Sequence, residues 1–168
     1  MSDEAEGIEL EWLSPDRFMR SEERRRVRQL LRQQKSLSDQ KWPIAGDIRL
    51  APAQREKLDA KWRASHARLD ELSADMLKRY LGIGLYSVLH VRHPDRPDTL
   101  LQVLRVDVEF NDWNRRWLWR VHGRKLRKNG TLGFADAYVC FDLADVRRRR
   151  LDGTWERVLP LDLADELV

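Results

Sequence analysis

The spacing of apolar residues changes once along the chain, near Ile83. Before this point, apolar side chains recur every three or four residues in two long segments, which is the period of an α-helix. After it, apolar and polar residues alternate, which is the period of half-buried strands. This order predicts an α+β fold, in which an N-terminal pair of helices precedes a five- or six-stranded antiparallel meander. The meander is expected to form a curved sheet or a small barrel.

The first predicted helix begins at Ser14 and runs to about Lys35. Serine is a common cap, proline fits the first helical turn, and Asp16 suits the positive end of the helix dipole. A narrow apolar stripe follows, made of Phe18, Val27, Leu30 and Leu31. Arginines surround this stripe at Arg24, Arg25, Arg26, Arg28 and Arg32.

The second predicted helix runs from Pro52 to about Leu81, and Gly82 is well suited to end it. Its apolar positions are spaced four and three residues apart, at Leu58, Trp62, Ser65, Leu69, Leu72 and Met76. This heptad-like seam is expected to pack against the first helix as a hairpin. A homodimer formed through the seam at 58–76 is the alternative.

Turn signals divide the second half of the chain into strands. They comprise the segment 93–98, Asn111 with Asp112, Asn129 with Gly130, and Asp152 with Gly153. The clearest strand has Leu104, Val106, Val108 and Phe110 on one side and Val103, Arg105, Asp107 and Glu109 on the other. The first strand is expected to begin near Leu85.

These patterns predict four consecutive parts. They are an acidic, partly disordered segment at 1–13, a helical hairpin region at 14–82 with a linker at 36–51, an antiparallel β domain at 83–160, and an acidic tail at 161–168. The chain has 32 basic and 28 acidic residues, so its net charge of +4 says little about partners. The segregation of charge is more informative, because the segment 113–130 contains seven Arg or Lys and no Asp or Glu.

Within this cationic segment, the residues from Trp117 alternate in character. Trp117, Trp119 and Val121 form the apolar side, and Arg120, His122 and Arg124 form the other side. The pattern predicts a strand with a buried back and a positively charged front.

A cationic strand of this kind favours binding of nucleic acid, DNA or RNA. Arginine and lysine contact phosphates, and exposed aromatic rings stack on unpaired bases. The predicted nucleic-acid-binding residues are Trp113, Arg115, Arg116, Arg120, Arg124, Lys125, Arg127, Lys128, Arg147, Arg148, Arg149 and Arg150. Tyr86, Trp113 and Trp155 are the candidates for stacking. We therefore expect a non-enzymatic nucleic-acid-binding accessory protein.

Two other functions stay open. A protein–protein interaction or assembly subunit could use the same arginines to bind an acidic partner. A metal-dependent nuclease could use Asp107 and Glu109, which share one face of a strand, with His122 or Lys125 opposite. The usual nuclease lysine is replaced by Asn111, and cross-strand pairing of the two carboxylates with Arg120 and His122 explains them without catalysis.

The remaining candidates for chemistry are isolated residues. His90 and His93 straddle a strand end, and Cys140 is the single cysteine, which excludes an internal disulfide and favours a small, semi-buried side chain. We expect no metal and no cofactor. No segment has the length and apolar character of a membrane span, so we expect no membrane association and a cytoplasmic location.

Overall fold

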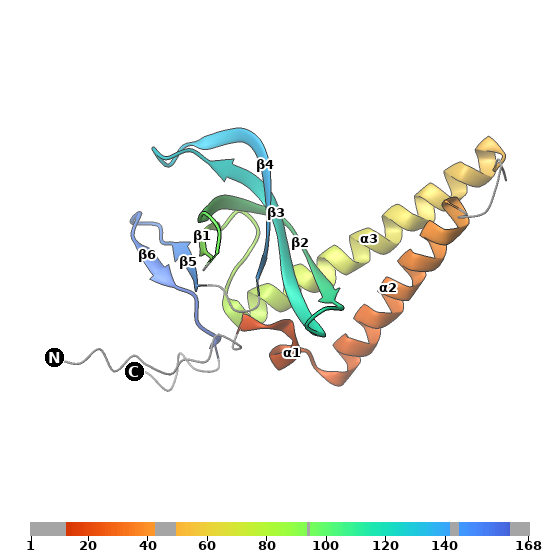
Figure 1. Ribbon diagram of the computed structural model, residues 1–168, viewed down its shortest axis with the longest axis horizontal. Coiled ribbons are helices and arrows are strands. Elements are labelled where there is room, and N and C mark those ends of the chain that lie inside the picture. Colours follow the sequence, from red (N-terminus) through yellow and green to blue (C-terminus); the bar gives the residue numbers. More distant parts are fainter. Residues whose placement is uncertain (1–12, 43–49, 94, 142–144, 162–168) are drawn as a thin grey trace.

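The computed structural model describes residues 13–42, 50–93, 95–141 and 145–161. Three helices precede the sheet: α1 (Pro15–Phe18), α2 (Ser21–Lys41) and α3 (Pro52–Leu81). The long helices α2 and α3 lie side by side as a hairpin that extends well beyond the sheet (Figure 1). Among the described helices, none is both long and apolar enough to cross a membrane.

The first helix differs from its prediction near its start and at its end. The helical turn that begins after Ser14 stops at Phe18, and α2 starts after the extended residue Arg20, whose N–H donates to the carboxylate of Glu23. Met19 is buried at this break, so tertiary packing overrides a continuous helical pattern. The helix then continues to Lys41, past the predicted end near Lys35, because Leu37 extends the buried stripe. The predicted linker thus begins later, and its residues 43–49 lie outside the described part.

Six strands form one antiparallel sheet in the order β4-β3-β2-β1-β5-β6, which confirms the α+β prediction. They are β1 (Val88–Arg92), β2 (Thr99–Asn111), β3 (Arg116–Leu126), β4 (Leu132–Phe141), β5 (Asp145–Arg149) and β6 (Trp155–Arg157). The sheet is curved and does not close into a barrel (Figure 1). Only β1 to β4 form a simple meander, because β5 pairs with β1 rather than with β4.

Two strand details differ from the sequence pattern. The first strand starts at Val88 instead of near Leu85, because Tyr86 adopts a positive φ of 68° in the turn that precedes it. In β2, a bulge between Val103 and Arg105 interrupts the alternation. Val103 is therefore completely buried and Leu104 is exposed, the reverse of the predicted sides.

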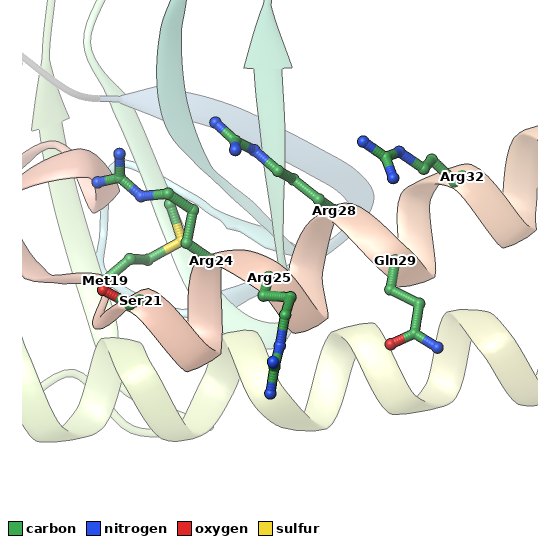
Figure 2. A pocket seen from close by; sticks show the side chains of 7 residues that line it. All are labelled: Met19, Ser21, Arg24, Arg25, Arg28, Gln29 and Arg32. Atoms are coloured by element: carbon green, nitrogen blue, oxygen red, sulfur yellow. The ribbon is translucent and has the colours of Figure 1, made fainter.

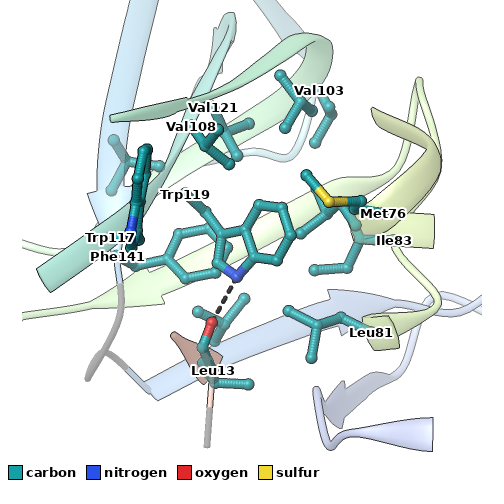
Figure 3. Close-up of a cluster of buried hydrophobic side chains, with 14 of the residues drawn as sticks. Leu13, Met76, Leu81, Ile83, Val103, Val108, Trp117, Trp119, Val121 and Phe141 are labelled. Atoms are coloured by element: carbon teal, nitrogen blue, oxygen red, sulfur yellow. Dashed lines mark hydrogen bonds between the residues drawn. The ribbon is translucent and has the colours of Figure 1, made fainter. Parts of the chain in front are cut away.

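The core lies between the sheet and the C-terminal half of α3. Trp117, Trp119 and Val121 all face it, as the alternation along β3 predicts. Figure 3 shows Trp119 surrounded by apolar side chains, with its indole N–H donating to the carbonyl oxygen of Leu13. Met76 contributes from α3 and is completely buried. The sheet is thus anchored on one face, and its other face, which we call the outer face, carries the polar side chains.

The seam of α3 is covered within the chain. Ser65, Leu69 and Met76 are buried, and α3 packs against both α2 and β2. The predicted helical hairpin is therefore observed. The homodimer through 58–76 stays a prediction.

The acidic segment and tail predicted at the two ends lie almost wholly outside the described residues, which begin at Leu13 and end at Leu161.

Candidate nucleic-acid interface

Arg120, the central arginine of the cationic strand, is bound by carboxylates of the neighbouring strand. The register that starts at the β2–β3 turn, where Asn111 pairs with Arg116, places Asp107 directly opposite Arg120. The Nε of Arg120 lies 2.6 Å from Oδ1 of Asp107, and its Nη1 lies 3.1 Å from Oε2 of Glu109. Asp107 has no exposed surface. The cross-strand pairing inferred from the sequence is thus present, and Arg120 has little charge to offer a phosphate.

Further charged groups surround this pair. Arg105 lies 3.1 Å from the Nε2 atom of His122 through its Nη2, and 3.5 Å from Oδ2 of Asp70 on α3 through its Nε. Nε2 of His122 also lies 3.6 Å from Oδ2 of Asp107. We call this group the paired cluster: Asp70, Arg105, Asp107, Glu109, Arg120 and His122. Asp70 escaped the sequence analysis because no pattern indicates which helical residue meets a given strand.

The environment of the paired cluster shifts two of its pKa values. Burial, joined by the charge of Asp107, raises the pKa of Asp70 to about 6. Burial, joined by the charge of Arg105, lowers the pKa of His122. Close to neutral pH, Asp70 of the paired cluster is therefore ionised and His122 is uncharged. Keeping Asp70 ionised in this environment lowers the stability of the folded protein.

The carboxylates predicted for a nuclease site are engaged within the chain. The two carboxylates that would hold a metal are occupied by Arg120. Within the described residues, no group of three or more His, Cys, Asp or Glu side chains could hold a metal ion. Burial also raises the pKa of Cys140, which keeps its thiol protonated and weakly nucleophilic.

The basic residues at the far end of β3 have a different environment. Arg124 faces Gln102 of β2, which carries no charge. Asp136 of β4 is its other register partner, but the two side chains form no ion pair. Lys125 and Lys128 likewise form no ion pair with any described carboxylate, and the guanidinium of Arg127 lies 5.8 Å from the ring centre of Phe134.

Arg149 of β5 joins these residues across the sheet. A Cβ atom placed on Gly130, in the turn between β3 and β4, would lie only 3.6 Å from Nη1 of Arg149. The curvature of the sheet thus brings the turn at Gly130 and the end of β5 together (Figure 1). We call Arg124, Lys125, Arg127, Lys128 and Arg149 the hairpin-end patch.

The other arginines of the run 147–150 are engaged within the chain. Arg148 binds Glu156 and the carbonyl oxygen of Gly82, and Arg150 donates to Glu156 over 2.7 Å. Arg147 lies 3.9 Å from Asp145. Of this predicted run, Arg149 is therefore the side chain best placed for an external anion.

Trp113 lies away from the hairpin-end patch. It is 98% exposed in the turn between β2 and β3, next to Arg115 and Arg116. Residues 116–123 of β3 separate this turn from Arg124, the nearest residue of the patch on this strand, which is about 26 Å at roughly 3.3 Å per residue. Trp113, Arg115 and Arg116 therefore lie at the opposite end of β3 from the hairpin-end patch.

Exposed aromatic rings accompany the hairpin-end patch. Phe134 is 89% exposed beside Arg127, and Tyr86 is 69% exposed. Tyr86 and Arg149 line one cavity of about 840 Å³. Trp155 is partly exposed and makes an edge contact with the ring of His90 at 5.7 Å. The sequence analysis identified Tyr86 and Trp155 as stacking candidates but missed Phe134, although an apolar residue soon after the Asn129 turn was a usable signal.

Comparisons with protein-family models, with curated proteins and with solved structures find no match to this chain.

Proposed function

We propose that the protein is a non-enzymatic accessory protein that binds nucleic acid through the hairpin-end patch. The observation that carries this proposal is the position of Arg149 beside Gly130. It joins two basic segments that lie far apart in the sequence into one surface. No member of this patch forms an ion pair with a described carboxylate.

The side chains of the patch suit the chemistry of a phosphate backbone. Arg124, Arg127 and Arg149 can each grip a phosphate with two parallel hydrogen bonds, and Lys125 and Lys128 add compact charges. Binding releases the counterions that surround the nucleic acid, so unpaired cations gain most from it. Arg120 is left out of the proposed surface because Asp107 and Glu109 neutralise it.

The aromatic rings support contact with unpaired bases. Phe134 and Tyr86 present flat surfaces next to the cations, and every base can stack on such a surface. Tyr86 is also held in a positive-φ turn, where its N–H donates to the carbonyl oxygen of Val103 over 2.7 Å. The turn fixes the backbone of Tyr86 in the free protein. Less conformational entropy is therefore lost when the ring binds a ligand. We place this function in the cytoplasm.

The test is a binding titration by fluorescence anisotropy with single- and double-stranded DNA and RNA over a salt series. We expect binding to single strands with an affinity that falls steeply with salt. The slope should be about 0.7 log units per log of salt for each neutralised phosphate. Absence of binding at low salt, or an affinity that does not change with salt, would overturn the proposal.

A second candidate function is binding of an acidic protein partner, which the exposure of Trp113 favours. A fully exposed tryptophan between Asp112 and Arg115 has the character of an interface anchor. Poly-glutamate is a suitable probe, because it carries charge without bases. If it binds as tightly as an oligonucleotide of equal charge, and if Trp113→Ala abolishes its binding, this second function replaces the first.

A further inference from the structure

The N-terminal half of α2 presents a second basic surface, separate from the hairpin-end patch. The buried stripe of this helix contains Val27, Leu30 and Leu37. The opposite side at 3.6 residues per turn carries Arg25, Arg28, Gln29 and Arg32, and all four are exposed. Figure 2 shows Arg24, Arg28 and Arg32 projecting along one edge of this face, with Arg25 and Gln29 along the other.

This face is hollowed rather than flat. The four residues, with Met19, Ser21 and Arg24, line a cleft of about 830 Å³. A second cleft of about 450 Å³ lies alongside, shares Arg25 and Gln29 with the first, and adds Arg26 and Arg68 together with the carboxylate of Glu22. A ligand lying along α2 would therefore meet cations on both of its sides.

The charges on this face are not neutralised within the described part of the chain. Arg24 is held by Asp16, whose carbonyl oxygen lies 2.9 Å from its Nη2. Arg25, Arg28 and Arg32 form no ion pair with a described carboxylate. Glu23, which is near in sequence, is taken up by Arg79 and Tyr80 of α3. Like charges three or four residues apart on a helix repel each other and destabilise it. An anionic ligand would reduce this repulsion between the arginines of α2.

We propose that this face of α2 binds in the major groove of duplex DNA. An α-helix of about 10–12 Å diameter matches the roughly 12 Å width of that groove. Arginine pairs with guanine edges and glutamine with adenine edges, and Gln29 lies between Arg25 and Arg32 on the face. Arg24 and Arg26 flank the face, where the phosphates of the two strands would lie.

Two observations favour duplex DNA over other anionic partners. The face lies opposite the buried stripe of α2, so a rod-shaped duplex can approach it from the solvent side. The deep, narrow major groove of duplex RNA excludes a helix, which singles out DNA. An acidic protein would pair with the arginines but would give Gln29 no comparable role.

The experiment uses the full chain and compares two double variants that remove the same charge. Arg28→Ala with Arg32→Ala removes two cations from the proposed face, and Lys57→Ala with Lys61→Ala removes two exposed cations from α3. Anisotropy titrations with a duplex DNA, a duplex RNA and a single strand of equal length give the affinities. Thermal unfolding by circular dichroism checks that both variants fold.

We expect the α2 variant to bind duplex DNA at least tenfold more weakly and to discriminate less among duplex sequences, because two contacts to base edges are lost. Its affinity for the single strand should be unchanged. This result distinguishes the α2 site from the hairpin-end patch, whether or not the patch binds the single strand. Gln29→Ala should alter the preference among duplex sequences at constant salt slope. Three results would each overturn the proposal. They are an equal loss of affinity for duplex DNA in the α3 variant, an equal loss of affinity for duplex RNA in the α2 variant, and poly-glutamate binding that depends on Arg28 and Arg32.

Discussion

Two arginines on the same side of β3, only four residues apart, differ in whether they form ion pairs. Arg120 faces Asp107 and Glu109 and is neutralised by them, whereas Arg124 faces the uncharged Gln102 and forms no ion pair. The alternating pattern along β3 treats the two residues alike. Their difference comes from β2, and it divides one cationic strand into a structural part and a part that is open to a ligand.

The comparison teaches that the charge of a strand is a property of its neighbours as much as of its own sequence. A guanidinium beside a fully buried carboxylate keeps the fold together, because neither charge can be left alone without cost. A guanidinium without such a partner stays hydrated and exchanges its water and counterions for a phosphate. The paired cluster and the hairpin-end patch are these two cases.

The largest expected effect follows from removing Arg120. Arg120→Ala leaves Asp107 as a buried charge, and we expect a loss of about 3 kcal/mol in the free energy of unfolding. Arg124→Ala is the matched control and should change the free energy of unfolding by less than about 0.5 kcal/mol. Denaturation in urea measures both. If the two substitutions lower the free energy of unfolding equally, the proposed difference between the paired cluster and the hairpin-end patch is contradicted.

A smaller effect is expected from Asp70, which makes the stability of the paired cluster depend on pH. Its pKa is raised to about 6 in the folded protein, so the folded state holds a proton that the unfolded state loses near pH 4. The stabilisation from this proton is complete below about pH 4 and is lost as the pH rises through about 6. Asp70→Asn removes the buried negative charge that destabilises the folded state at neutral pH. We expect the substitution to raise the free energy of unfolding by about 2 kcal/mol at pH 7.5.

The urea midpoint measured from pH 3.5 to pH 8 checks this prediction. The difference between Asp70→Asn and the original chain should shrink as the pH falls and vanish near pH 4. A constant difference over this range would show that Asp70 is not the titrating group.

The smallest effect on stability is expected from giving Arg124 a carboxylate on β2, in addition to its register partner Asp136 on β4. Gln102→Glu places an acidic residue at the register partner of Arg124, and a cross-strand ion pair stabilises a sheet by about 0.5 kcal/mol or less. The same substitution should weaken nucleic-acid binding and lower the salt slope by about 0.7, the contribution of one phosphate contact. Gln102→Ala is the control, and an equal loss of affinity in both variants would contradict the pairing.

Much of the fold follows from local patterns in the sequence. The alternation along β3 identified Trp117, Trp119 and Val121 as core residues, and all three are buried. Gly130 and Gly153 adopt the positive φ angles expected of the turns that contain them. These features depend on neighbouring residues alone, so a single sequence reveals them.

The missed features depend on register and curvature. The bulge at Leu104 inserts one extra residue into β2, and this shift is what sets Gln102, rather than Val103, opposite Arg124. No residue type demands a bulge there. Likewise, the pairing of β5 with β1 and the approach of Arg149 to Gly130 arise from the bending of the whole sheet. The sequence therefore predicts which residues are cationic, but not which of them keep their charge available.

The most direct test of the account measures the salt dependence of single-strand binding for a variant of the hairpin-end patch. Arg124→Ala with Lys125→Ala should lower the slope by about 1.4, because two phosphate contacts are lost at about 0.7 each. Lys57→Ala with Lys61→Ala removes the same charge from exposed positions of α3 and should leave the slope unchanged. An unaltered slope in the patch variant, or an equal decrease in both variants, would contradict the claim that the hairpin-end patch contacts the phosphates.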